Sequence, residues 1–170
     1  VSVADRFYFN LHRDSPALGL ILGPPVPGRL TGQPVITLSR RMEFADGSFR
    51  GVIVAGLDPS YFAEFYQAID LGPRSEIALM DTEGRLFVGG ASGGQPGHTV
   101  SWPLLQQVLA GGNGGTVIGS GFQGRGEYIF AYRRLADYPM LAVVGLDREA
   151  MLSSWGQGEI WRLGLVTMLG

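Results

Sequence analysis

The chain has 170 residues, 45% of them apolar and 11% aromatic, so it can bury one large or two small cores and is not a disordered chain. Its 13 basic residues are all arginine, and 15 acidic residues leave a net charge of −2 without a basic stripe, which argues against nucleic-acid binding. The absence of cysteine excludes disulfide scaffolds, thiolate metal sites and cysteine nucleophiles.

Residues 34–57 predict two strands joined by a turn. "VITLSRRMEF" alternates in part, "ADGS" supplies an Asp-Gly turn, and "FRGVIVAGL" is a β-rich return strand. A helix is predicted next, because Asp58 stands at an N-cap position, Pro59 at the first helical position, and Gly72 can end the helix.

The remaining elements complete a second sheet. Strands are predicted at 76–81 and 85–88, a short helix between Ser101 as cap and Gly111 as stop, and three strands at 115–120, 127–135 and 140–146. Asp147 then opens a final helix. Short connections favour antiparallel pairing of sequential strands, so the predicted fold is α+β, with a sheet of about five strands and helices on one side.

The two ends of the chain predict a fragment and leave two interpretations of its last residues. The sequence starts without methionine or a signal peptide, so we expect a fragment. Residues 160–170 are apolar but too few for a bilayer span, which takes about 20 residues. They fit either the tail of a buried helix or the entry to a transmembrane helix with Trp155, Trp161 and Arg162 at the interface.

A repeated pattern links the two predicted sheets. Gly-Leu-Asp at 56–58 returns at 145–147, and the arginine pair at 40–41 returns at 133–134. Each copy ends a strand and starts a helix, which favours a duplicated module.

The chain resembles the double Cache family, whose modules have a PAS-like fold. The resemblance rests on "ADRFYF" at 4–9, "TGQPVITLSRR" at 31–41, "DGSFRGVIVAGLDPSYFAEFY" at 46–66, "IALMDTEGRL" at 77–86 and "YRRLADYPMLAVVGLD" at 132–147. These segments follow the family's order over nearly the whole chain. The family comprises extracytoplasmic sensor regions of bacterial membrane receptors, notably diguanylate cyclases and histidine kinases.

The resemblance implies the domain organisation and the function. Residues 1–58 would be the later part of an incomplete membrane-distal module, 59–158 the membrane-proximal module, and 159–170 the start of a transmembrane helix. The chain would then be a periplasmic ligand-sensing domain of an inner-membrane receptor, without catalysis of its own. It would form a homodimer, bind an amino acid, carboxylate or amine, and pass the signal through its C-terminal helix to a cytoplasmic cyclase or kinase.

Five residues are candidate ligand contacts: Arg6, Tyr8, Phe9, Arg40 and Asp58. Arg6, Tyr8 and Phe9 fit a loop over the distal sheet, where the family recognises ligands; the alternative is a turn with its aromatic rings in the core. Asp58 could bind a ligand ammonium group or simply cap the next helix. Arg40 and Arg41 must point to opposite faces of their strand, so one is solvated and the other pairs with an acid or enters the pocket.

Catalytic, metal and cofactor sites are not predicted. Gly90–Gly94 fits G-x-S-x-G around Ser92, but it lies in a glycine-rich loop and not at a strand-to-helix elbow. His12 and His98 have no metal-ligand spacing. Two alternatives to a sensor remain: a small hydrolase that uses Ser92, or a structural or dimerisation module without a ligand.

Overall fold

The computed structural model describes residues 3–29, 31–69, 71–72, 74–91 and 94–153, and its chain divides into two compact units. Unit 1 is Val1–Phe62 and unit 2 is Ala63–Gly170. The boundary falls within helix α2 (Pro59–Gln67). No helix in the described part of the chain is long and apolar enough to cross a bilayer, and the segment 159–170 lies outside that part.

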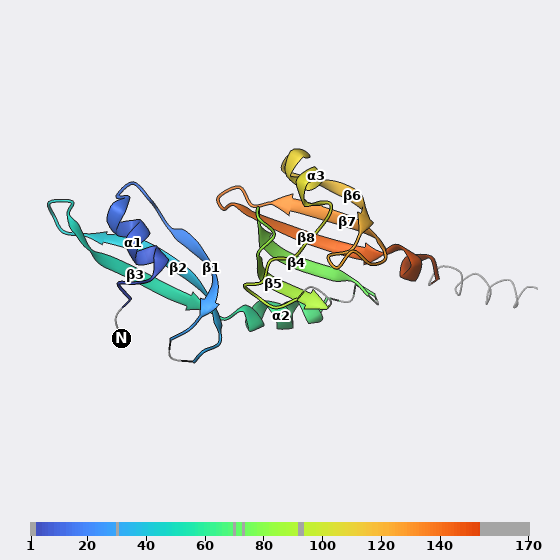
Figure 1. Cartoon of the computed structure of the whole chain (residues 1–170), viewed down its shortest axis with the longest axis horizontal. Coiled ribbons are helices and arrows are strands. Elements are labelled where there is room, and N and C mark those ends of the chain that lie inside the picture. The colour runs from blue at the N-terminus through green and yellow to red at the C-terminus, as the bar shows by residue number, and fades with distance from the viewer. Residues whose placement is uncertain (1–2, 30, 70, 73, 92–93, 154–170) are drawn as a thin grey trace, which may run out of the picture. The chain divides into compact units, whose positions relative to one another are not determined.

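Unit 1 is an antiparallel sheet of three strands with one helix on it (Figure 1). Helix α1 (Phe7–Asp14) precedes strands β1 (Ile21–Pro27), β2 (Pro34–Glu43) and β3 (Phe49–Leu57), and the sheet order is β1-β2-β3. The hairpin predicted at 34–57 is confirmed. In its turn, Asp46 accepts a hydrogen bond from the Ser48 backbone N–H at 2.9 Å, and Gly47 takes the left-handed φ of 81° that favours glycine.

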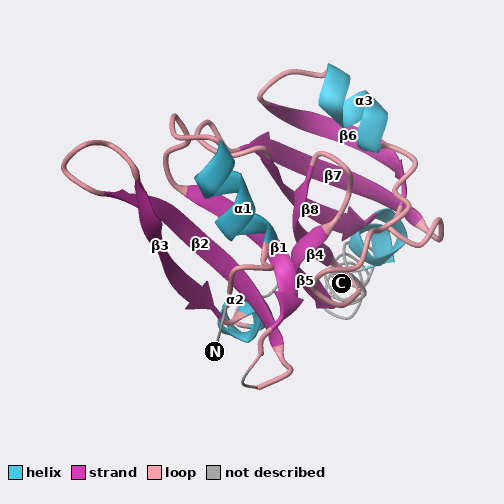
Figure 2. Ribbon diagram, turned by 60° about the vertical axis from the view of Figure 1, so that its left-hand side comes forward, coloured by secondary structure: helices cyan, strands magenta, loops and turns pink. Residues whose placement is uncertain are grey.

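Two elements of unit 1 were not predicted from the sequence. The segment expected as a loop around Phe9 is helical, because Tyr8 and His12, four residues apart, form a buried face over the sheet. Figure 2 shows this helix lying across the strands. Strand β1 was not predicted because it contains three prolines. An edge strand tolerates proline at positions that do not donate a hydrogen bond to the neighbouring strand, and β1 is an edge strand.

Unit 2 is an antiparallel sheet of five strands in the order β5-β4-β8-β7-β6. Its elements are β4 (Glu76–Asp81), β5 (Leu86–Ala91), α3 (Leu105–Ala110), β6 (Gly114–Ser120), β7 (Glu127–Arg134) and β8 (Met140–Asp147). Residues 148–153 are helical, as predicted from Asp147. The five-stranded antiparallel sheet with flanking helices is therefore confirmed.

Two details of unit 2 differ from the prediction. The first strand, β4, pairs with the last, β8, whereas the prediction had only sequential strands as neighbours. Helix α3 begins at Leu105 and not after Ser101, and its cap residue Leu104 makes no side-chain cap hydrogen bond. The predicted Ser101 cap was wrong; the exposed Ser101 precedes the buried Trp102, which packs edge-on against Phe122 and Phe130 with ring centroids 5.3 and 4.9 Å apart.

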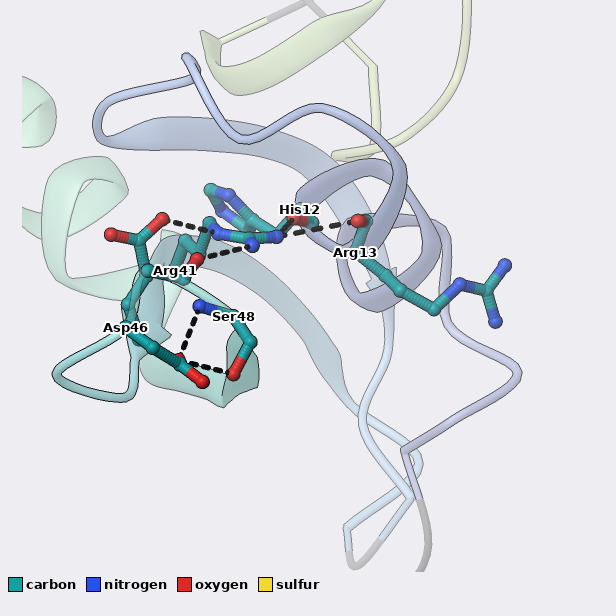
Figure 3. Close-up of polar contacts among 7 residues, drawn as sticks. His12, Arg13, Arg41, Asp46 and Ser48 are labelled. Atoms are coloured by element: carbon teal, nitrogen blue, oxygen red, sulfur yellow. Dashed lines mark hydrogen bonds and ion pairs between the residues drawn. The ribbon is translucent and has the colours of Figure 1, made fainter.

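The repeated arginine pairs have one structural role in common. Arg41 on β2 donates from Nη1 to the His12 carbonyl oxygen in the last turn of α1 (Figure 3). In unit 2, Arg134 on β7 donates to the Leu109 carbonyl oxygen in the last turn of α3. The C-terminal carbonyls of a helix lack intrahelical partners and carry partial negative charge, so a cation there ties the helix to its sheet.

Candidate ligand cavity

A cavity of about 250 Å³ lies in unit 1, on the sheet face that also carries helix α1. On β2, alternate residues from Val35 to Arg41 share this face. Helix α1 occupies the half at Ser39 and Arg41, and His12 Nε2 lies 3.1 Å from Ser39 Oγ. The other half, at Val35 and Thr37, is left to the cavity. Its lining consists of Val3, Arg6, Tyr8, Val26, Pro27, Gly28, Arg29, Val35, Thr37, Val54 and Gly56.

Arg6 stands at the N-cap position of α1, with extended backbone (φ −75°, ψ 143°). Its Nη2 donates to the Pro27 carbonyl oxygen at the end of β1, at 3.1 Å. This bond fixes the guanidinium at the cavity and uses one of its five N–H donors. The remaining donors form the fork that can bind a carboxylate with two parallel hydrogen bonds.

The other lining residues are mainly apolar, and two buried ones, Tyr8 and Thr37, carry a hydroxyl. Tyr8 is only 5% exposed and packs edge-on against Phe7, with ring centroids 5.6 Å apart. Thr37 is 7% exposed, and its Oγ1 is buried without a hydrogen-bond partner among the residues described. An unsatisfied buried hydroxyl is uncommon in folded proteins, and this one belongs to a residue of the cavity lining.

The charges at the cavity favour an anionic ligand. Two lining residues, Arg6 and Arg29, are cationic, and Arg29 forms an ion pair with Asp5. No acidic residue belongs to the lining within the described part of unit 1. A ligand carboxylate would find donors here, whereas an ammonium group would meet like charge.

Arg6 and Tyr8 line the cavity, and the other three candidate residues lie elsewhere. Phe9 packs edge-on against Phe49 on β3, with centroids 5.3 Å apart. Arg40 is exposed, and Asp58 follows the end of β3, also exposed. Of the arginine pair, Arg40 is therefore the solvated residue, while Arg41 pairs with an acid: its Nε lies 2.7 Å from Glu43 Oε1.

Asp58 acts as a helix cap in this structure. Its Oδ1 accepts a hydrogen bond from the Ser60 backbone N–H at 2.8 Å, at the start of α2. This bond and a second from the Ser60 hydroxyl hold the pKa of the Asp58 carboxyl below its usual value. Asp147 has the same place at the end of β8, with the Ala150 N–H donating to its Oδ1 at 2.7 Å. The repeated Gly-Leu-Asp is therefore a strand end followed by a capped helix start.

Sequence reasoning missed Thr37, Arg29 and Gly56. Thr37 and Gly56 are cross-strand partners, so the hairpin register places them on one face together with Val35 and Val54. That register was predictable from the Asp-Gly turn. Which face α1 covers was not, because α1 itself was read as a loop.

Metal binding has no support in the described residues, which contain no group of three or more His, Asp or Glu side chains that could hold an ion. Ser92, the candidate nucleophile of the hydrolase alternative, lies outside them.

Solved structures similar to this chain are sensor domains. The extracellular domain of rpHK1S-Z16, assigned to the histidine kinases, is 34% identical with a TM-score of 0.79, covering 91% of this chain and 64% of that one. The periplasmic sensory domain of the Campylobacter jejuni chemoreceptor Tlp1 is 12% identical, with a TM-score of 0.73 and coverage of 88% and 57%. The ligand-binding domain of the Pseudomonas fluorescens chemoreceptor CtaA, in complex with L-serine, is 15% identical, with a TM-score of 0.59 and coverage of 88% and 63%.

This chain thus spans less than two thirds of the length of these solved domains. A comparison with curated proteins gives no significant match. The sequence profile of the dCache_1-like family, described as histidine kinase sensor domain, matches residues 59–145, which is half of the chain. A domain of this family binds a ligand and does not catalyse a reaction. With its PAS-like antiparallel sheet and flanking helices, the chain belongs to the dCache_1-like sensor domains of histidine kinases.

Proposed function

We propose that this chain is the extracytoplasmic ligand-sensing region of a transmembrane receptor, and that unit 1 holds the ligand. The cavity lined by Arg6 and Tyr8 is the observation that carries the proposal. Of the five candidate residues, Arg6 and Tyr8 are kept as ligand contacts, because Phe9, Arg40 and Asp58 do not line it.

The proposed ligand is a small molecule with a carboxylate and an apolar body. Solved structures of similar fold contain asparagine in Mlp24 and L-serine, L-alanine or L-isoleucine in CtaA, which supports a ligand of this size. In our chain Arg6 would bind the carboxylate, and Tyr8 with the lining valines would enclose the apolar part.

The proposal extends to the rest of the receptor. It includes a periplasmic location, a homodimer, and a transmembrane helix starting at 159–170, and the family membership supports these parts of the proposal. Ligand binding would shift the balance between two arrangements of the modules, and the helix after Asp147 would carry the shift to a cytoplasmic kinase or cyclase.

Three compounds with the same sec-butyl group test the ligand class. L-Isoleucine, 3-methylpentanoate without the ammonium group, and 2-methylbutylamine without the carboxylate are titrated into the chain by calorimetry and thermal shift. We expect the two carboxylates to bind and the amine not to. A ligand at 100 times its Kd adds about 2.7 kcal/mol to the free energy of unfolding, which is readily visible as a higher Tm. Binding of the amine in preference to both carboxylates would contradict the anionic ligand.

Arg6→Gln tests the proposed contact. Hydrogen bonds to a charged group contribute about 1.5–3 kcal/mol, so we expect Kd for the bound carboxylate to rise about 10- to 100-fold. Arg13→Gln is the matched control, because Arg13 is an exposed arginine of α1 paired with Asp14 and does not line the cavity. Equal Kd values for the two variants would exclude Arg6 as the carboxylate contact.

A further inference from the structure

Arg74, in the turn before β4 of unit 2, has an unusual backbone conformation. Its φ of 61° makes it the one residue other than glycine with positive φ in the described part of the chain. An arginine gains nothing from this region of φ by itself, so its contacts must compensate for the conformation.

Those contacts are made with residues at the start of the C-terminal helix, 148–153. Arg74 Nε lies 3.2 Å from Asp147 Oδ2, while the other oxygen of Asp147 caps the helix at the Ala150 N–H. One carboxylate thus joins two segments: the turn that precedes β4 and the first turn of helix 148–153. Arg74 also reaches Glu149 Oε2 at 3.4 Å, but Glu149 is 85% exposed and this second ion pair contributes little.

Burial makes the Asp147 carboxylate dependent on its partners. Its side chain is 5% exposed, and a second buried carboxylate, Glu76, lies on the neighbouring strand and accepts the Phe122 N–H at 3.0 Å. Tyr128 lies opposite Asp147 on β7, and burial together with the charges of Glu76 and Asp147 raises the pKa of its phenol. In this acidic neighbourhood, Arg74 is the cation that contacts Asp147.

We propose that Arg74 is a positioning residue that couples the turn after α2 to the C-terminal helix. The ion pair holds Asp147 in its capping position while Arg74 is in place, and displacement of Arg74 releases the cap. Helix α2 begins directly after β3 of unit 1, and the chain continues from it to Arg74. A shift of Arg74 would therefore reach helix 148–153 through one side chain. The coupling stands without the proposed function, but its use in signalling rests on that function.

Amide exchange in the full chain, measured by NMR, tests the cap. We expect Arg74→Gln to accelerate exchange of the Ala150 amide about 10-fold and to leave the amides of β7 unchanged. Arg74→Gly should do the same, although glycine relieves the left-handed backbone, and this separates the charge from the strain. Arg148→Gln is the control, since Arg148 pairs with Glu127 and leaves Asp147 intact. Unchanged exchange in both Arg74 variants would overturn the proposal.

A double-mutant cycle tests the coupling. Gly72 has a φ of 82°, so Gly72→Ala strains the turn that precedes Arg74 without touching the ion pair itself. We expect Gly72→Ala to accelerate Ala150 exchange in the wild-type background and to add nothing in Arg74→Gln. Equal effects in both backgrounds would show that the turn does not act through Arg74. These outcomes require no ligand, so a failed ligand titration and a failed coupling are separate results.

Discussion

Gly145→Ala is expected to destabilise unit 2 by about 1–3 kcal/mol, the usual cost of inserting a methyl group into a packed core. A Cβ at this position of β8 would lie 2.3 Å from Phe130 Cε1 and 2.7 Å from Cδ1. Phe130 is fully buried and packs against the rings of Trp102, Phe122 and Tyr128, which restrict its movement. Urea denaturation followed by the fluorescence of Trp102, with Trp155 and Trp161 replaced by phenylalanine in both proteins, measures the loss.

The first copy of the repeat supplies the control. A Cβ at Gly56 would meet Val35 Cγ1 at 2.9 Å, but both residues line the cavity, and Val35 can turn into that space. We therefore expect Gly56→Ala to cost under 1 kcal/mol in unit 1, as judged by amide exchange of β2, while narrowing the cavity. If Gly145→Ala lowered the free energy of unfolding no more than Gly56→Ala does, the Phe130 ring would not be held in place.

Arg41→Ala is expected to destabilise unit 1 by about 1.5–3 kcal/mol, the contribution of hydrogen bonds from a charged group. The Arg41 side chain is 8% exposed. It donates to the carbonyl oxygens of His12 and, at 3.3 Å, Arg13 (Figure 3). Its guanidinium carbon also lies 4.9 Å from the centre of the Phe49 ring. Its loss frees the end of α1, so amide exchange should rise across the helix and ligand affinity should fall with it.

The adjacent arginine is the matched control for this prediction. Arg40 is exposed, and we expect Arg40→Ala to change the free energy of unfolding by less than about 0.5 kcal/mol. Arg41→Lys should fall between the two, because lysine keeps the charge but not the planar fork. Equal losses for Arg40→Ala and Arg41→Ala would contradict the assignment of Arg41 as the residue that ties α1 to the sheet. Accelerated exchange in α1 also distinguishes Arg41→Ala from Arg6→Gln, which removes a ligand contact.

Local sequence signals predicted most of unit 2 and the hairpin of unit 1. Asp46 and Gly47 predicted the turn between β2 and β3, because their preferences are set by their own backbone. Asp58 and Asp147 predicted two helix starts for the same reason: a cap acts within its own turn.

The tertiary structure decided what depends on contacts between distant segments. Phe7, Tyr8 and Phe9 are consecutive aromatic residues without helical spacing, and only packing on β2 turns them into a helix that buries Tyr8 and leaves Phe9 against Phe49. Likewise, no local preference selects Arg41 over Arg40 for burial, because the choice depends on which face of β2 receives α1.

The type of fold, the two capped helix starts and the family are predictable without coordinates, since they follow from local preferences and from motifs in a fixed order. Packing between separate elements brings Arg6, Tyr8 and Thr37 to one cavity and leaves Asp58 outside it. It also decided that Arg74 reaches Asp147, more than seventy residues further along the chain. The physical reason is that a ligand cavity and an ion pair are made by side chains from separate elements, whose relative placement is fixed by packing.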